Sequence, residues 1–136
     1  MAVRLHRFTG LALLLFITSH LAVHLVALHS PEAHAAALAV VRKAYRPTLV
    51  EPVLIAAFAT QIGVGLRLAW ARWRSGLGGA MAGWQLASGL YLALFLLNHV
   101  GAALATRLVF GLDSNFHWAA ATLLHPVTRW FFYPYY

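Results

Sequence analysis

Three long apolar stretches constrain this chain more than any other feature. They cover about residues 5–29, 48–72 and 83–110, and each reaches the ~20 residues that a helix needs to cross a bilayer. Hydrophobic residues make up 62% of the 136 residues and charged residues only 10%, which leaves too little polar surface for a soluble globule. We therefore expect an all-α integral membrane protein, a single domain over residues 1–136 with three transmembrane helices.

The first apolar stretch is expected to stay in the protein. It begins at the amino terminus, but it is longer than the apolar core of a signal peptide. It also lacks a small-residue cleavage site followed by a soluble domain. We therefore interpret it as a retained transmembrane helix.

A short interfacial helix is predicted after the first span, over residues 31–45. Ser30 is a good cap residue, Pro31 suits the first helical position, and Glu32 places an acid in the first turn. Pro47 disfavours continuation of the helix beyond this segment. The segment is alanine-rich and basic, as expected for a helix that lies along lipid headgroups.

A second interfacial helix is predicted near the carboxyl terminus, over residues 114–132. Its start is marked by a capping signal that ends at Asn115. The segment is rich in aromatic residues and is interrupted by Pro126, a composition that favours the interface over a fourth span.

The basic residues weakly favour one orientation. The ten lysines and arginines divide equally between the two sides of a three-span protein. The clusters at 4–7 and 67–74 lie nearest the span ends and contain no acid, so we expect a cytoplasmic amino terminus in a bacterial inner membrane. Anionic lipid accounts for the net charge of +7, and no nucleic-acid partner is expected.

The side-chain inventory limits the chemistry. The chain has no cysteine, which excludes disulfides, thiolate metal sites, iron–sulfur ligation and covalent haem attachment within it. No nucleophile–base arrangement, glycine-rich phosphate loop or pair of carboxylates is present in the sequence. We therefore expect no catalysis by this chain alone, and any metal must be held by histidine or oxygen.

Two histidines lie at matching depths in the first and third spans. His20 and His99 are each about sixteen residues into their helix, or ~24 Å at ~1.5 Å per residue. If the two helices run in the same direction, their imidazoles meet at one level. Ionisable side chains within spans are costly and by default functional. This arrangement suits the two axial ligands of a haem iron, although each histidine could instead bond a neighbouring helix.

Residues around this pair could complete a cofactor site. Ala102 and Ala103 offer a smooth surface beside His99 for a flat ring, and Arg107 could meet a haem propionate. His24 could replace His20 as a ligand, or serve as a propionate or quinone partner. The other interpretation is that small residues merely allow close helix packing.

The other histidines give weaker signals. A zinc site from His20 and His24, which are four residues apart, lacks a nearby third ligand. Four more histidines are expected to face headgroups or solvent. These are His29, His34, His117 and His125.

Several short segments resemble one known family. Residues 4–10 (Arg-Leu-His-Arg-Phe-Thr-Gly) open the first helix, Ser-His-Leu surrounds His20, and Asn-His-Val surrounds His99. The Pro-Glu-Ala-His run at 31–34 follows the first span. Together they resemble the cytochrome b membrane subunits of succinate dehydrogenases and fumarate reductases, especially the single-chain type with two haems.

That resemblance implies specific roles and one departure. In the family, four histidines hold two b haems, one between the first and third helices and one between the second and fourth. His20 and His99 match the pair of the haem farther from the dehydrogenase subunits. Gln61 stands where the second-helix histidine would be, and the family's last two helices have no counterpart.

We therefore expect one haem b per chain and one-electron transfer in or near a quinone-linked respiratory complex. Expected partners are lipid, possible quinone, and either a second copy or iron–sulfur and flavoprotein subunits. Such an assembly would cover Gln61, Gly63 and Gly65. The alternative is a haem-free anchor or assembly subunit that keeps the cytochrome b scaffold.

Overall fold

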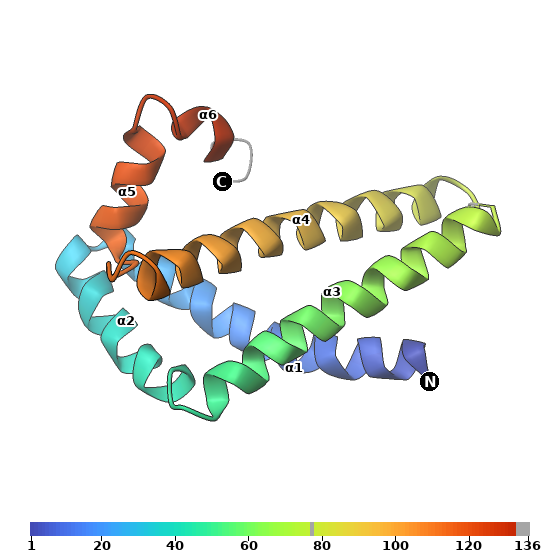
Figure 1. The fold of residues 1–136 in the computed structure, drawn as a ribbon, viewed down its shortest axis with the longest axis horizontal. Coiled ribbons are helices and arrows are strands. Elements are labelled where there is room, and N and C mark those ends of the chain that lie inside the picture. Colours follow the sequence, from blue (N-terminus) through green and yellow to red (C-terminus); the bar gives the residue numbers. More distant parts are fainter. Residues whose placement is uncertain (77, 133–136) are drawn as a thin grey trace.

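Three long apolar helices dominate the computed structural model, which describes residues 1–76 and 78–132 (Figure 1). They are α1 (Ala2–Leu25), extended by the 3-10 turn η1 (Val26–Leu28), α3 (Val50–Arg74) and α4 (Ala80–Leu108). All three are long and apolar enough to cross a membrane, and the described residues contain no strand. This confirms an all-α integral membrane protein with three candidate spans, whose ends differ from the prediction by a few residues.

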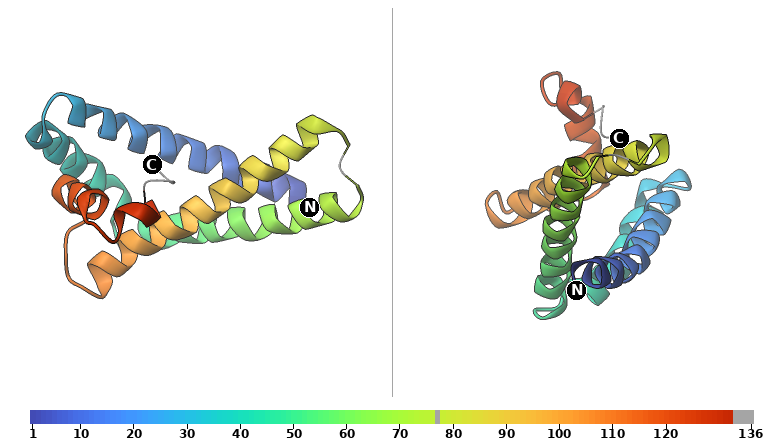
Figure 2. Two further views of the ribbon diagram at one scale, coloured as in Figure 1. Left: turned by 90° about the horizontal axis from the view of Figure 1, so that it is seen from above. Right: turned by 90° about the vertical axis from the view of Figure 1, so that its right-hand side faces the viewer.

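The first and third spans run in the same direction, and the second runs in the opposite direction (Figure 1). Helix α1 packs along α3, and α3 also packs against α4. Helices α1 and α4 are not packed along their length (Figure 2). The parallel direction of α1 and α4 is the condition under which His20 and His99 can meet.

The protein buries little apolar surface within itself. Most large apolar side chains on the spans are exposed in the isolated chain, as expected where lipid covers them. The buried apolar side chains among the described residues are Leu13, Val23, Leu38, Phe58 and Ala82. Specific contacts between the helices therefore depend largely on polar and aromatic side chains.

Helix α2 (Pro31–Tyr45) follows the first span with the predicted bounds. The Ser30 hydroxyl oxygen accepts a hydrogen bond from the Ala33 N–H at 3.1 Å, which caps the helix. Hydrogen bonds from the Glu32 backbone and then from the Ser30 side chain lower the pKa of the Glu32 carboxyl. The local signals thus produce the expected helix start.

The carboxyl-terminal segment differs from the single helix predicted over 114–132. It forms two helices, α5 (Phe116–Leu124) and α6 (Arg129–Phe132). The Asn115 side chain caps α5 by accepting from the Trp118 N–H at 3.0 Å. The helix ends at His125, whose extended backbone (φ −66°, ψ 132°) is the conformation favoured before a proline. Pro126 therefore divides the segment.

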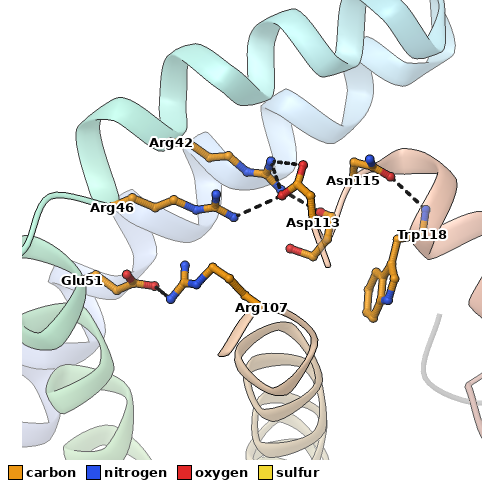
Figure 3. Close-up of polar contacts among 8 residues, drawn as sticks. Arg42, Arg46, Glu51, Arg107, Asp113, Asn115 and Trp118 are labelled. Atoms are coloured by element: carbon orange, nitrogen blue, oxygen red, sulfur yellow. Dashed lines mark hydrogen bonds and ion pairs between the residues drawn. The ribbon is translucent and has the colours of Figure 1, made fainter. Parts of the chain in front are cut away.

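An ion-paired junction ties α2 to the segment before α5 (Figure 3). Arg42 Nη1 donates to both carboxylate oxygens of Asp113 at 2.9 Å, and its Nη2 donates to the Ser114 carbonyl at 2.7 Å. Arg46 approaches the same carboxylate at 3.7 Å. This junction holds the short helices against the ends of the spans.

Candidate functional site

Four histidines from three helices lie in a row. The rings of His20 on α1 and His99 on α4 have centroids 5.9 Å apart, at an interplanar angle of 71°. His24 Nε2 lies 3.2 Å from His20 Nε2, and His24 Nδ1 lies 3.2 Å from His34 Nε2 on α2. The structure therefore brings together the two histidines expected at one level, and adds two more.

Phenylalanines one helical turn earlier support both central imidazoles. Phe16 stacks on His20 with centroids 5.7 Å apart and an interplanar angle of 14°. Phe95 stacks on His99 at 5.4 Å and 11°. Phe16 is in turn held by an edge contact with the buried Phe58 of α3. The orientation of the two histidine rings is thus set by neighbouring aromatic side chains.

The rings of His20 and His99 meet edge to face, and His20 Nε2 lies against His24 Nε2. No group of three or more His, Asp or Glu side chains in the described residues converges on one metal position. The use of His20 and His99 as metal ligands stays a prediction.

The small residues beside His99 leave space on α4. Ala102 and Ala103 are half-buried, and a Cβ added at Gly101 would meet nothing within 4 Å. These features are compatible with a flat ring at this surface. The assignment of Ala102 and Ala103 to a cofactor site stays a prediction.

Arg107 is engaged with another helix. Its Nη2 donates to Glu51 Oε1 of α3 at 2.6 Å, and both side chains are half-buried (Figure 3). A propionate at this position would have to share or displace that carboxylate. The proposed role of Arg107 in binding a propionate stays a prediction.

His34 is buried, whereas the sequence predicted that it faces headgroups. Only 2% of its surface is exposed, and its ring contacts His24 and the edge of Phe116. His34 and the buried Leu38 are four residues apart, so one face of α2 carries both. This four-residue spacing was the sequence signal that His34 lies on a buried face. The alanines around it make the amphipathic pattern of the helix weak. His29, His117 and His125 are exposed, as expected.

A second polar cluster lies between α1 and α3. Thr9 Oγ1 donates to Gln61 Oε1 at 2.5 Å, and Gln61 Nε2 lies 3.4 Å from His6 Nε2. Two glycines make room for these side chains. A Cβ at Gly10 would lie 3.1 Å from Gln61 Nε2, and one at Gly65 would lie 3.2 Å from His6 Cε1.

This cluster shows that Gln61 and Gly65 are partly covered within the chain, and their coverage by a partner chain stays a prediction. Helix α1 of the same chain already contacts both residues. Gly63 differs, because a Cβ there would meet nothing within 4 Å. Of the three residues expected at an assembly surface, Gly63 is exposed and the other two are half-buried.

No known protein family matches this chain, and neither a curated protein nor a solved structure is similar to it. The resemblance to cytochrome b subunits therefore rests on the short segments of sequence described above. The geometry itself provides two imidazoles in edge-to-face contact, from two apolar helices that run in the same direction.

Proposed function

We propose that this chain binds one b-type haem between His20 and His99 and carries single electrons within a membrane. The observation that carries the proposal is the 5.9 Å separation of the two rings across parallel apolar helices. A haem iron with two imidazole ligands is coordinatively saturated, so it supplies one-electron transfer and not oxygen binding.

The chain's own residues would define the site in three ways. His20 and His99 supply the ligand nitrogens, and the stacked rings of Phe16 and Phe95 restrict their rotation. The apolar side chains of α1 and α4 exclude water. His24 and Arg107 are the proposed partners for polar groups at the cofactor's edge, which each would reach by changing its present contact.

Electron transfer requires a donor and an acceptor outside this chain. We propose quinone, a second copy, or iron–sulfur and flavoprotein subunits as candidates, in a bacterial inner membrane with the amino terminus in the cytoplasm. Open helix surfaces at Gly63 and Gly89 support close packing with another membrane helix, because a Cβ at either would meet nothing within 4 Å.

A second candidate function is a haem-free membrane anchor or assembly subunit. It is favoured by the fact that the histidines already contact one another. His20 Nε2 lies 3.2 Å from His24 Nε2, and Arg107 is paired with Glu51. In this case the histidines would serve as hydrogen-bonding links between α1 and α2.

The absorption spectrum of protein purified from haem-replete cells, before and after dithionite, separates the two functions. The haem protein should show a sharp low-spin alpha band on reduction. His20→Ala and His99→Ala should each abolish or convert that band, whereas His125→Ala, at an exposed turn, should leave it unchanged. A colourless wild-type preparation would refute haem binding and favour the anchor.

A further inference from the structure

We propose that His34 and His24 are positioning residues that hold the proton of neutral His20 on Nδ1 and leave its lone pair on Nε2. His34, His24 and His20 form what we term the imidazole ladder, with nitrogen–nitrogen distances of 3.2 Å at both steps. The buried residue, His34, determines which nitrogen donates and which accepts in each hydrogen bond of the ladder. The use of that lone pair by iron rests on the proposed function, but the direction of the ladder does not.

The buried end of the ladder is His34. Its Nδ1 is buried and has no hydrogen-bond partner among the described residues, while its Nε2 faces His24. In its neutral form, an imidazole carries one N–H and one lone pair. Buried N–H groups without an acceptor are rarer than acceptors without a donor. His34 therefore carries its proton on Nε2 and donates it to His24.

The position of the proton on His34 determines the tautomers of His24 and His20. Because His24 accepts at Nδ1, its own proton is on Nε2. That N–H points to His20 Nε2, which must accept it with its lone pair. The remaining proton of His20 is then on Nδ1. One unpartnered nitrogen on α2 thus determines the tautomer of a histidine on α1.

The tautomer matters because a metal binds the unprotonated nitrogen, and hydrogen bonding decides which nitrogen that is. A free histidine side chain in water favours its proton on Nε2, the opposite arrangement. The ladder therefore keeps the lone pair of His20 on Nε2, where it accepts the His24 N–H until a ligand takes its place. His24 is exposed and can turn away when that lone pair is taken, whereas His34 is fixed by burial against Phe116.

Nitrogen NMR of the haem-free protein tests the ladder directly. In ¹⁵N-histidine-labelled protein in lipid nanodiscs, protonated and bare ring nitrogens have well-separated shifts, and His20→Gln identifies the His20 signals. Wild-type His20 should show a bare Nε2. His34→Phe fills the buried position without a donor and should move most of the His20 population to the Nε2–H form. His34→Gln, which keeps an N–H donor, should restore the wild-type pattern.

The control is His29→Gln, at an exposed position outside the ladder, which should leave the His20 signals unchanged. If His34→Phe does not fold, His24→Ala removes the immediate donor at an exposed site and should give the same change. A protonated Nε2 on wild-type His20, or a His20 tautomer unaffected by a folded variant lacking the donor, would overturn the proposal.

The two proposals fail separately. A colourless protein with the expected His20 tautomer would keep the ladder and refute haem binding. A protein that binds haem, but whose haem-free form has the opposite His20 tautomer, would keep the haem proposal and refute the ladder.

Discussion

Polar side chains are arranged differently at the two ends of the helical bundle. At the histidine end, where α1 and α4 finish beside α2, imidazoles from three helices meet in a row. At the amino-terminal end, where α1 begins beside the end of α3, Thr9, Gln61 and His6 contact one another between two helices. At the histidine end, the ligand-type side chains His20 and His99 come from two spans and meet edge to face. The amino-terminal cluster is a closed contact, fitted around Gly10 and Gly65.

The charges divide in the same way. All three acidic residues, Glu32, Glu51 and Asp113, lie at the histidine end, and two of them form ion pairs with arginines there. At the amino-terminal end, the charged residues are all basic and lie at 4–7 and 67–74. These basic clusters lie nearest the span ends, and on that ground we propose that this end is cytoplasmic.

The largest expected effect is an all-or-none difference in labelling between the two ends. The chain has no native cysteine, so Ser75→Cys and Ala36→Cys each provide a single exposed probe, at the amino-terminal and histidine ends respectively. We expect a membrane-impermeant maleimide added to intact cells to label residue 36 but not residue 75. Labelling of only residue 75 would reverse the orientation, and equal labelling in sealed cells would contradict the three-span topology.

A large side chain at Gly65 should disrupt the amino-terminal cluster. Its Cβ would lie 3.2 Å from His6 Cε1, so Gly65→Leu must displace the His6 ring. Overpacking of this kind costs about 1–3 kcal/mol, measurable by unfolding in mixed micelles. Gly63→Leu is the matched control, because nothing lies within 4 Å of a Cβ there. Equal destabilisation by both variants would show that the contact with His6 is not the cause.

The ion pair between Arg107 and Glu51 should contribute a smaller amount. Its atoms are 2.6 Å apart and both side chains are about a quarter exposed, so solvent screens the attraction only in part. We expect a coupling free energy of about 1 kcal/mol in a double-mutant cycle of Arg107→Gln and Glu51→Gln. Arg74→Gln, at the basic end, should change stability little. Purely additive effects of Arg107→Gln and Glu51→Gln would mean that the pair does not join α3 to α4.

The smallest effect is expected at Gln61. Gln61→Leu removes the hydrogen bond from Thr9, and hydrogen bonds between membrane helices contribute about 0.6 kcal/mol on average. The unfolding free energy should fall by about that amount, and Thr9→Val should have little further effect in the Gln61→Leu background. A loss as large as that from Gly65→Leu would indicate that the hydrogen bond, rather than close packing, holds this end together.

The amino-acid sequence by itself determined the spans, the start of α2 and the matched depths of His20 and His99. These features depend on local properties. The length of an apolar stretch fixes a span, a serine before a proline begins a helix, and a constant rise per residue fixes depth. The same local rules placed the Asn115 cap correctly but did not predict the end of α5 at Leu124, where Pro126 imposes an extended backbone on His125.

Only the tertiary structure decided which side chains meet. His34 turns inward because α2 folds back onto the end of α1, Arg107 pairs with a carboxylate 56 residues earlier, and Gln61 bonds Thr9 across 52 residues. No local pattern specifies such partners, because they depend on the direction and rotation of helices packed against one another. The histidine pair could be anticipated from depth alone, whereas the imidazole ladder required the fold.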